Sequence, residues 1–348
     1  MTRWNGWRED DILVFMNGTW WGERMVNVRL MPPWSWVSYV GAVTSVLRSR
    51  GVKCDFANVA GMSGYAFVVN IHPELLPFGP VAFDWEVLIE GTQGMGIMTE
   101  LVAVERTEED EHIFAELFER VRAEVDSGRC CVVWGAGSAP EFGVVYGYRD
   151  DYYLVRSSRS SAVRLEKERL LGPQDEPEEP IRFNQLNAPW RLAAVFFGES
   201  FKPERMAQER RAVARAVKLL RGLVPCFSGD YHYGAGAFRT WADVIEKRRA
   251  DRLGSFYNLM CYWELQMFAS GFCKRISRKW SRAKEELTRA GTLFYQSFAN
   301  LEKVRTLIGE NGDFRRERDL ALAGELIKGC AVFNEQAANA LESALGLM

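Results

Sequence analysis

Histidine is scarce in this sequence, and the common spaced metal motifs are missing. The chain has 348 residues and only 3 His, and it contains neither a CxxC nor an HExxH pattern. Zinc sites draw on Cys and His at such spacings. We therefore expect no metal site, and nothing in the sequence calls for a bound cofactor.

Strong charge of one sign and long apolar runs are also lacking. The 44 Lys and Arg nearly balance the 46 Asp and Glu, for a net charge of -2, which argues against a nucleic-acid partner attracted by the global field. No window approaches the ~18 consecutive apolar residues of a membrane-spanning helix. Residues 1–5 contain no apolar signal core. We therefore expect a cytoplasmic protein with no membrane partner.

Cysteine is present but does not suggest a disulfide framework. The count of 7 is odd and the spacing irregular, which fits a reducing compartment. Cys130 and Cys131 should point to opposite faces of one strand. The other cysteines lie among apolar neighbours and are expected to be small buried hydrophobes; they are Cys54, Cys226, Cys261, Cys273 and Cys330.

Apolar patterning predicts two domains, an α/β unit over residues 1–200 and a helical unit over residues 201–348. Short strands are expected at 12–16, 65–70, 98–104, 130–134, 142–148, 152–155 and 192–197. Helices are expected at 38–50, 56–62, 83–90, 111–125, 203–224, 240–251, 254–275, 277–308 and 313–346. The last helix should bury one stripe, formed by Leu322, Leu326, Cys330, Phe333, Ala337 and Leu341.

Four segments resemble a known family in order and spacing. Residues 38–51 (SYVGAVTSVLRSRG) match a helix that in the family opens with a nucleophilic Cys, and here opens with Ser38. Residues 59–67 (VAGMSGYAF) are similar to its Gly-Leu-Ser-Gly-x-Ala-Phe signature. Residues 140–148 (PEFGVVYGY) resemble the strand that starts with the catalytic His, with Glu141 in its place. Residues 232–241 (HYGAGAFRTW) are similar to a motif of its helical domain.

The resemblance is to the butirosin biosynthesis protein H family and, more broadly, to papain-like cysteine peptidases. It implies an α+β fold, with a papain-like N-terminal domain whose sheet is mostly antiparallel and a C-terminal all-α bundle. It places the third member of the triad near Arg156 or Ser157. Pro32, Pro33 and Trp34 occupy the stretch where the family has its oxyanion-hole Gln.

The chemistry of such a site explains what the replacements remove. A helix N-terminus lowers the pKa of a thiol, and a neighbouring imidazole completes the ion pair. A hydroxyl at Ser38 is not ionised by a dipole effect of ~1 kcal/mol. Glu141 is a weak base unless burial raises its pKa. Ser38 is also a good helix cap, and Glu141 could hold the amine or guanidinium of a ligand instead.

Aromatic and histidine residues complete the set of candidate ligand contacts. Six of the 12 Trp lie in the first 36 residues, and Trp34 and Trp36 flank the expected helix start, although core packing is the more frequent role of such residues. His72 follows an expected strand. Tyr231 and His232 lie in a Gly- and Tyr-rich break between the two expected domains, where pockets often form.

Two functions of different class remain open, and the sequence does not decide between an enzyme and a binding protein. One is a degenerate papain-like domain that binds a peptide, small molecule or acyl ligand in natural-product or peptide metabolism. The other is an acyltransferase, or another amide-bond enzyme, that uses Ser38 and Glu141 and takes acyl groups from a carrier-protein thioester. Ser38 could also stand for an engineered Cys replacement. An acyl carrier protein and a second copy of the chain are open as partners.

Overall fold

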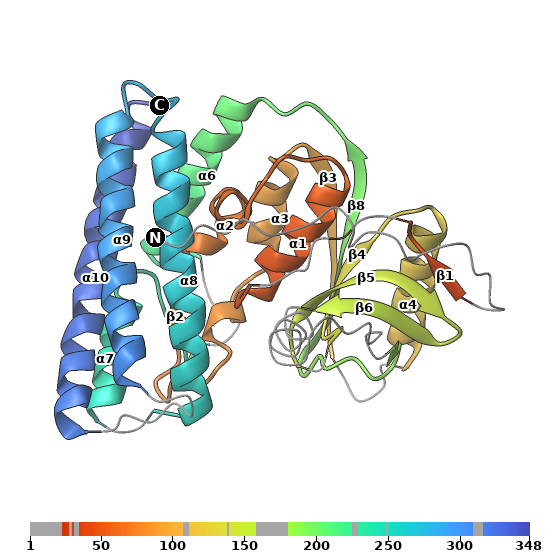
Figure 1. The fold of residues 1–348 in the computed structure, drawn as a ribbon, viewed down its shortest axis with the longest axis horizontal. Helices are drawn as coiled ribbons and strands as arrows, with labels where there is room; N and C mark the ends of the chain where they lie inside the picture. The colour runs from red at the N-terminus through yellow and green to blue at the C-terminus, as the bar shows by residue number, and fades with distance from the viewer. Residues whose placement is uncertain are drawn as a thin grey trace, which may run out of the picture.

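The computed structural model describes residues 23–27, 30, 35–106, 111–137, 139–157, 180–224, 229–247, 250–308 and 316–348. The strand expected at 12–16, together with Trp34 and Cys226, lies outside these ranges. Within them the chain folds into a mixed α/β structure with an antiparallel sheet and a helical C-terminal region. In Figure 1 the long helices stand on one side and the sheet on the other, with shorter helices between them.

The sheet has seven strands in the described part of the chain, ordered β3-β8-β4-β5-β6-β7, with β1 also paired to β5. Every pairing within it is antiparallel. The strands are β1 (Glu23–Met25), β3 (Ile97–Glu105), β4 (Cys131–Trp134), β5 (Phe142–Arg149), β6 (Tyr152–Ser157), β7 (Ile181–Arg182) and β8 (Arg191–Ser200).

The hairpin of β5 and β6 forms as the sequence predicts. Arg149 lies opposite Tyr152, so Asp150 and Asp151 alone make the turn. Asp150 adopts a positive φ of 48°, which short polar side chains tolerate and which two-residue hairpin turns require.

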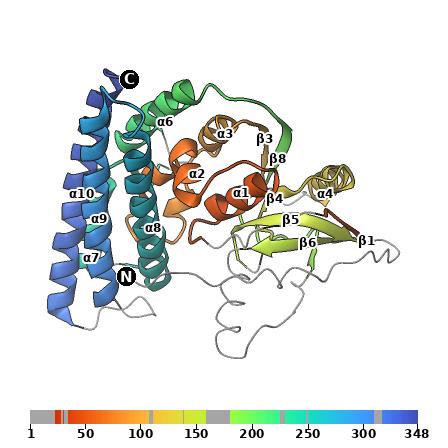
Figure 2. The same cartoon turned by 45° about the horizontal axis from the view of Figure 1, so that its top comes forward.

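The helices of the sheet-containing half are α1 (Ser38–Ser49), α2 (Phe56–Ser63), α3 (Glu86–Gln93) and α4 (Glu111–Asp126). Helix α1 packs on β4 and β5, and all of its residues from Ser38 to Leu47 are buried. Asp55 caps α2 by accepting a hydrogen bond from the Asn58 N–H. Because α2 also packs against α8 (Arg252–Ile276), α1 and α2 lie between the sheet and the C-terminal helices, as both views show (Figures 1 and 2).

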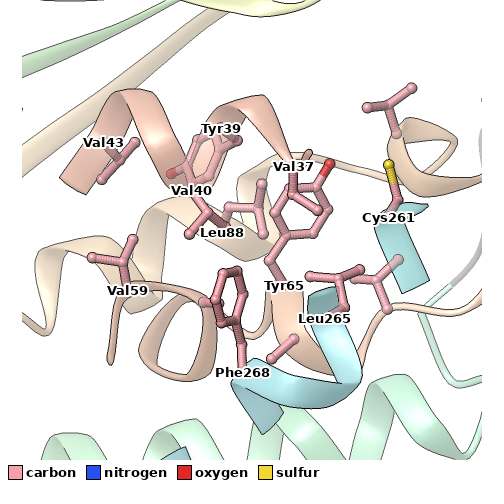
Figure 3. Packing of buried hydrophobic residues seen from close by; sticks show 14 of the residues in the cluster. Val37, Tyr39, Val40, Val43, Val59, Tyr65, Leu88, Cys261, Leu265 and Phe268 are labelled. Carbon is pink, nitrogen blue, oxygen red and sulfur yellow. The ribbon is translucent and has the colours of Figure 1, made fainter. Parts of the chain in front are cut away.

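The C-terminal region consists of α6 (Arg205–Leu220), α7 (Ala237–Glu246), α8, α9 (Lys284–Leu307) and α10 (Glu317–Leu345). Helices α8, α9 and α10 pack side by side. The apolar core is continuous from the sheet into these helices. Tyr65, Leu265 and Phe268 fill the space between α1 and α8 in Figure 3. No helix in the described ranges is both long and apolar enough to cross a membrane.

Several sequence expectations need correction. The strand expected at 65–70 is a 3-10 turn (Tyr65–Phe67) followed by the two-residue strand β2 (Asn70–Ile71). Tyr65 to Val69 are all buried, so the run packs as core on every side. A strand also occurs after residue 205, because β9 (His232–Tyr233) pairs with β2. Helix α9 begins at Lys284 rather than at residue 277.

The expected stripe of α10 is displaced at its start. Leu322 is 50% exposed, whereas Ala323 and Ile327 are buried. Farther along the helix Cys330, Ala337 and Leu341 are buried as expected. Leu326 and Phe333, which the sequence also placed on the stripe, are only partly buried.

Candidate functional site

Ser38 is the first residue of α1, and its hydroxyl joins the helix to the sheet. Ser38 is 4% exposed, and its Oγ accepts a hydrogen bond of 3.0 Å from the backbone N–H of Phe142, the first residue of β5. That N–H belongs to the peptide group linking Glu141 to Phe142. The two segments singled out by the sequence therefore meet at this hydrogen bond.

The cap of α1 differs from the sequence expectation. Val37 is the capping residue, and its side chain makes no capping hydrogen bond. The capping role expected of Ser38 is wrong, since Ser38 stands one position inside the helix. The Val37 N–H donates to the nearby Ser35 Oγ at 3.2 Å and also to an acceptor on a distant element, helix α8.

That acceptor is the carboxylate of Glu264. Its Oε2 accepts the Ser35 hydroxyl at 2.6 Å and the Val37 N–H at 3.1 Å. Glu264 is 8% exposed, and burial raises its pKa to about 7, against the opposing effect of its hydrogen bonds from Ser35, Val37 and Trp36. A carboxylate is favoured at a helix N-terminus by the unpaired N–H groups there.

Glu264 belongs to one face of α8. Tyr257, Cys261 and Glu264 follow the spacing i, i+4, i+7, which places them on the same side of a helix. The Cys261 Sγ–H donates to the Trp36 carbonyl at 3.5 Å. Burial, followed by the charge of Glu264, raises the pKa of the Cys261 thiol well above its usual range. Cys261 is therefore a neutral thiol and not a nucleophile.

Glu141 immediately precedes β5. The Gly135 N–H donates to the Glu141 carbonyl at 2.8 Å, which fixes the backbone before the strand. Burial raises the pKa of Tyr257, and electrostatic interactions with its neighbours, Glu141 among them, raise it further. Because Glu141 also acts on Cys261, its partly buried carboxyl lies within electrostatic reach of the α8 face.

The positions expected for a third triad member are on β6. Ser157 is buried and lies opposite Gly143, two residues along β5 from Glu141. The Arg156 guanidinium donates to the Leu30 carbonyl at 3.2 Å and lies over the Tyr146 ring. Arg156 is thus engaged with the opposite strand and the segment before α1.

The remaining candidate residues divide into two groups. Trp36 lies beside the start of α1, with its ring edge-on to Phe256 at 5.7 Å. His72, Tyr231 and His232 instead gather at the β2–β9 ribbon. The His72 and Tyr231 rings are 5.1 Å apart, and the His232 Nδ1 lies 2.9 Å from the Thr240 Oγ1.

All three histidines of the chain lie on elements other than the start of α1. His72 and His232 belong to the ribbon, and His112 is exposed on α4. The ribbon is tied to α8, because the Tyr262 hydroxyl donates to the Asn70 carbonyl at 2.6 Å. The structure therefore groups the two ribbon histidines with each other rather than with Ser38.

Sequence reasoning missed Glu264 and Ser35. A signal was available for Glu264, because it is the only charged residue between Arg252 and Lys274 in an otherwise apolar and polar-neutral stretch. A lone carboxylate in such a helix is rarely buried without partners. Its partner, however, lies 229 positions away, and nothing local identifies it.

Comparison with known proteins does not assign the chain to a family. No protein-family model matches the sequence, and no curated protein matches it significantly.

Proposed function

We propose that this chain is a binding protein on a papain-like framework, in which the position of the nucleophile has become a structural one. The observation that carries the proposal is the hydrogen bond from the Phe142 N–H to the buried Ser38 hydroxyl. A nucleophile needs an open approach and a base. Ser38 has instead one lone pair bound by a backbone amide, and its exposure is 4%.

The surroundings of Ser38 support a non-catalytic role. The carboxylate nearest the helix start, Glu264, already accepts hydrogen bonds from Ser35 and Val37. The helix dipole, worth ~1 kcal/mol, does not bring the pKa of a hydroxyl near neutrality. Loss of triad function costs about 10⁴-fold or more in rate, so ordinary peptidase activity is not expected.

The ligand that fits best carries a cationic group. The partly buried Glu141 carboxyl lies within electrostatic reach of Tyr257 and Cys261 on α8, and the Trp36 ring packs edge-on to Phe256 of the same helix. Amines and guanidinium groups are attracted by a carboxylate and by aromatic faces. The proposed ligand is a peptide or small molecule with such a group, and an acyl carrier protein is the proposed source of acylated ligands.

One arrangement favours an acyltransferase as the second candidate. The Ser38 hydroxyl accepts a hydrogen bond from the N–H of Phe142, the residue that directly follows Glu141. In this alternative Glu141 deprotonates the attacking amine, and Ser38 positions the carbonyl.

Agmatine, which carries an amine and a guanidinium, distinguishes the two candidates. The binding proposal expects saturable agmatine binding by calorimetry that weakens about tenfold or more in Glu141→Gln, through loss of a charge-assisted contact. Binding should be unchanged in the exposed control Glu285→Gln. A fluorophosphonate probe should leave Ser38 unlabelled.

The same amine tests the alternative when it is supplied with S-acetyl-N-acetylcysteamine. Acetyl-agmatine formation that disappears in both Ser38→Ala and Glu141→Gln would establish the enzyme instead. Agmatine binding of equal strength in wild type and Glu141→Gln would refute the assignment of Glu141 as the anchor.

A further inference from the structure

A hollow at the other end of α1 forms a second candidate site, distinct from Ser38. It lies where α1 ends, α2 begins and α8 ends, and its volume is about 420 Å³. It is lined by Arg48, Gly51, Val52, Lys53, Cys54, Asp55 and Arg275; we call this the basic hollow. We propose that the basic hollow binds the phosphate monoester group of a small-molecule ligand.

The charge of the lining matches such a group. The cations Arg48, Lys53 and Arg275 face a single carboxylate, Asp55, so three positive charges and one negative leave a net +2. A phosphate monoester carries about -1.5 to -2 near neutral pH. Arg275 pairs with Asp55, but a guanidinium has five N–H donors and retains others for a ligand.

Two of the three cations act on the same lining residue, Cys54. Burial raises the pKa of the Cys54 thiol to about 11, while the charges of Arg48 and Arg275 act to lower it. Both guanidinium groups therefore lie within electrostatic range of the Cys54 thiol, and Cys54 is 9% exposed. Guanidinium groups match phosphate oxygens in pairs of parallel hydrogen bonds.

The backbone leaves this space open. Gly51 lies two residues beyond the end of α1 with φ +79°, and no heavy atom lies within 4 Å of where its Cβ would stand. Asp55 is held in place because its carboxylate accepts the Asn58 N–H at the start of α2. The loop from Gly51 to Asp55 is thus fixed at both ends around an open space.

A wider basic region adjoins the basic hollow. The chain from 274 to 284 contains six cations and no acidic residue, and Arg278, Arg282 and Lys284 are exposed. Lys279 is paired with Glu209. Clustered charge of one sign raises the local concentration of oppositely charged ligands. The exposed cations Arg278, Arg282 and Lys284 therefore attract anions toward the basic hollow, and this attraction weakens as the salt concentration increases.

Calorimetric titration with phenyl phosphate tests the proposal, with benzoate as a carboxylate of similar size. Wild type should bind phenyl phosphate saturably and more tightly than benzoate. Arg48→Gln and Lys53→Gln should each weaken binding about tenfold or more, because each removes a charge-assisted contact. Lys303→Gln, an exposed lysine toward the other end of α9, is the matched control and should bind as wild type does.

Three results would overturn the proposal. The first is the absence of saturable phenyl phosphate binding, including the case in which hexaglutamate binds and the phosphate does not. The second is equal binding by wild type and both hollow variants. The third is a loss in Lys303→Gln as large as theirs. Thermal unfolding of each variant, expected to match wild type for these surface substitutions, confirms that the compared proteins are folded.

Discussion

The carboxylate of Glu264 and the hydroxyl of Ser35 lie 2.6 Å apart and join helix α8 to the segment that begins α1. Through the same carboxylate oxygen, the Val37 N–H at the helix cap gains an acceptor. The C-terminal helices therefore contribute directly to the end of α1 at which Ser38 stands. The start of α1 is therefore held by a buried ionisable group, the Glu264 carboxyl of α8.

The raised pKa of Glu264 predicts a specific dependence of stability on pH. Its folded-state pKa of about 7 lies above its ordinary value of 4.5, so the folded state holds the proton more tightly. The stabilisation of the folded state by protonated Glu264 is therefore complete below pH 4.5 and is lost as the pH rises through 7. A rise of the pKa from 4.5 to about 7 corresponds to about 3 kcal/mol.

Glu264→Gln removes this titration. The free energy of unfolding of the variant, relative to wild type, should rise by about 3 kcal/mol between pH 4.5 and pH 8. Urea unfolding at several pH values measures it. Glu285→Gln, at an exposed position on α9, should leave the wild-type profile unchanged. Parallel profiles for wild type and Glu264→Gln would show that the carboxyl does not titrate in this range.

Ser38→Ala tests the bridge between α1 and β5. The substitution leaves the buried Phe142 N–H without its acceptor, which should cost about 1–3 kcal/mol of unfolding free energy. Ser49→Ala is a matched control in the same helix, because the Ser49 hydroxyl donates to the Val46 carbonyl within α1 and is less buried. A cost no greater than that of Ser49→Ala would mean that the bridge contributes little to stability.

Local patterns predict the elements that meet at the site, but not how they are joined. The apolar spacing of 38–50 with Gly51 predicts α1, and the apolar run at 142–148 before a polar turn predicts β5. Each signal is contained within about a dozen residues. The run from Tyr65 to Val69 misleads for a physical reason, since a short, wholly buried apolar segment has no periodicity to distinguish strand from turn.

The joining contacts depend on pairs far apart in the chain. Ser38 and Phe142 are separated by 104 positions, and Ser35 and Glu264 by 229. The family resemblance placed Ser38 and Glu141 together, and the structure brings their segments into contact. The family resemblance did not indicate Glu264. That residue belongs to a helix for which periodicity predicts only the length and the buried side.

Gly143 is predicted to be intolerant of any side chain. A Cβ at this position would stand 2.0 Å from the Ala136 carbonyl oxygen, and a backbone atom cannot move aside as a flexible side chain does. Gly143→Ala should therefore lower the free energy of unfolding by at least about 2 kcal/mol. At Gly236 the nearest side-chain atoms are at 3.6 and 4.0 Å, so Gly236→Ala should be close to neutral. Similar unfolding midpoints for the two variants would contradict the close approach.

Tyr262→Phe tests the attachment of the histidine-bearing ribbon to α8. The Tyr262 hydroxyl donates to the Asn70 carbonyl at 2.6 Å and accepts the Asn70 N–H at 3.0 Å. Its removal leaves two buried backbone groups without these partners, at about 1–3 kcal/mol each.

Because β2 and β9 are only two residues long each, the ribbon has little other backbone support. We expect the Asn70 amide to exchange its hydrogen markedly faster in Tyr262→Phe, beyond what the change in global stability explains, as measured by native-state hydrogen exchange. Tyr295→Phe removes a hydroxyl from an exposed tyrosine of α9 and should leave exchange at Asn70 unaltered. Equal exchange rates in Tyr262→Phe and wild type would mean that the ribbon is held by the packing of Ile71 rather than by this hydroxyl.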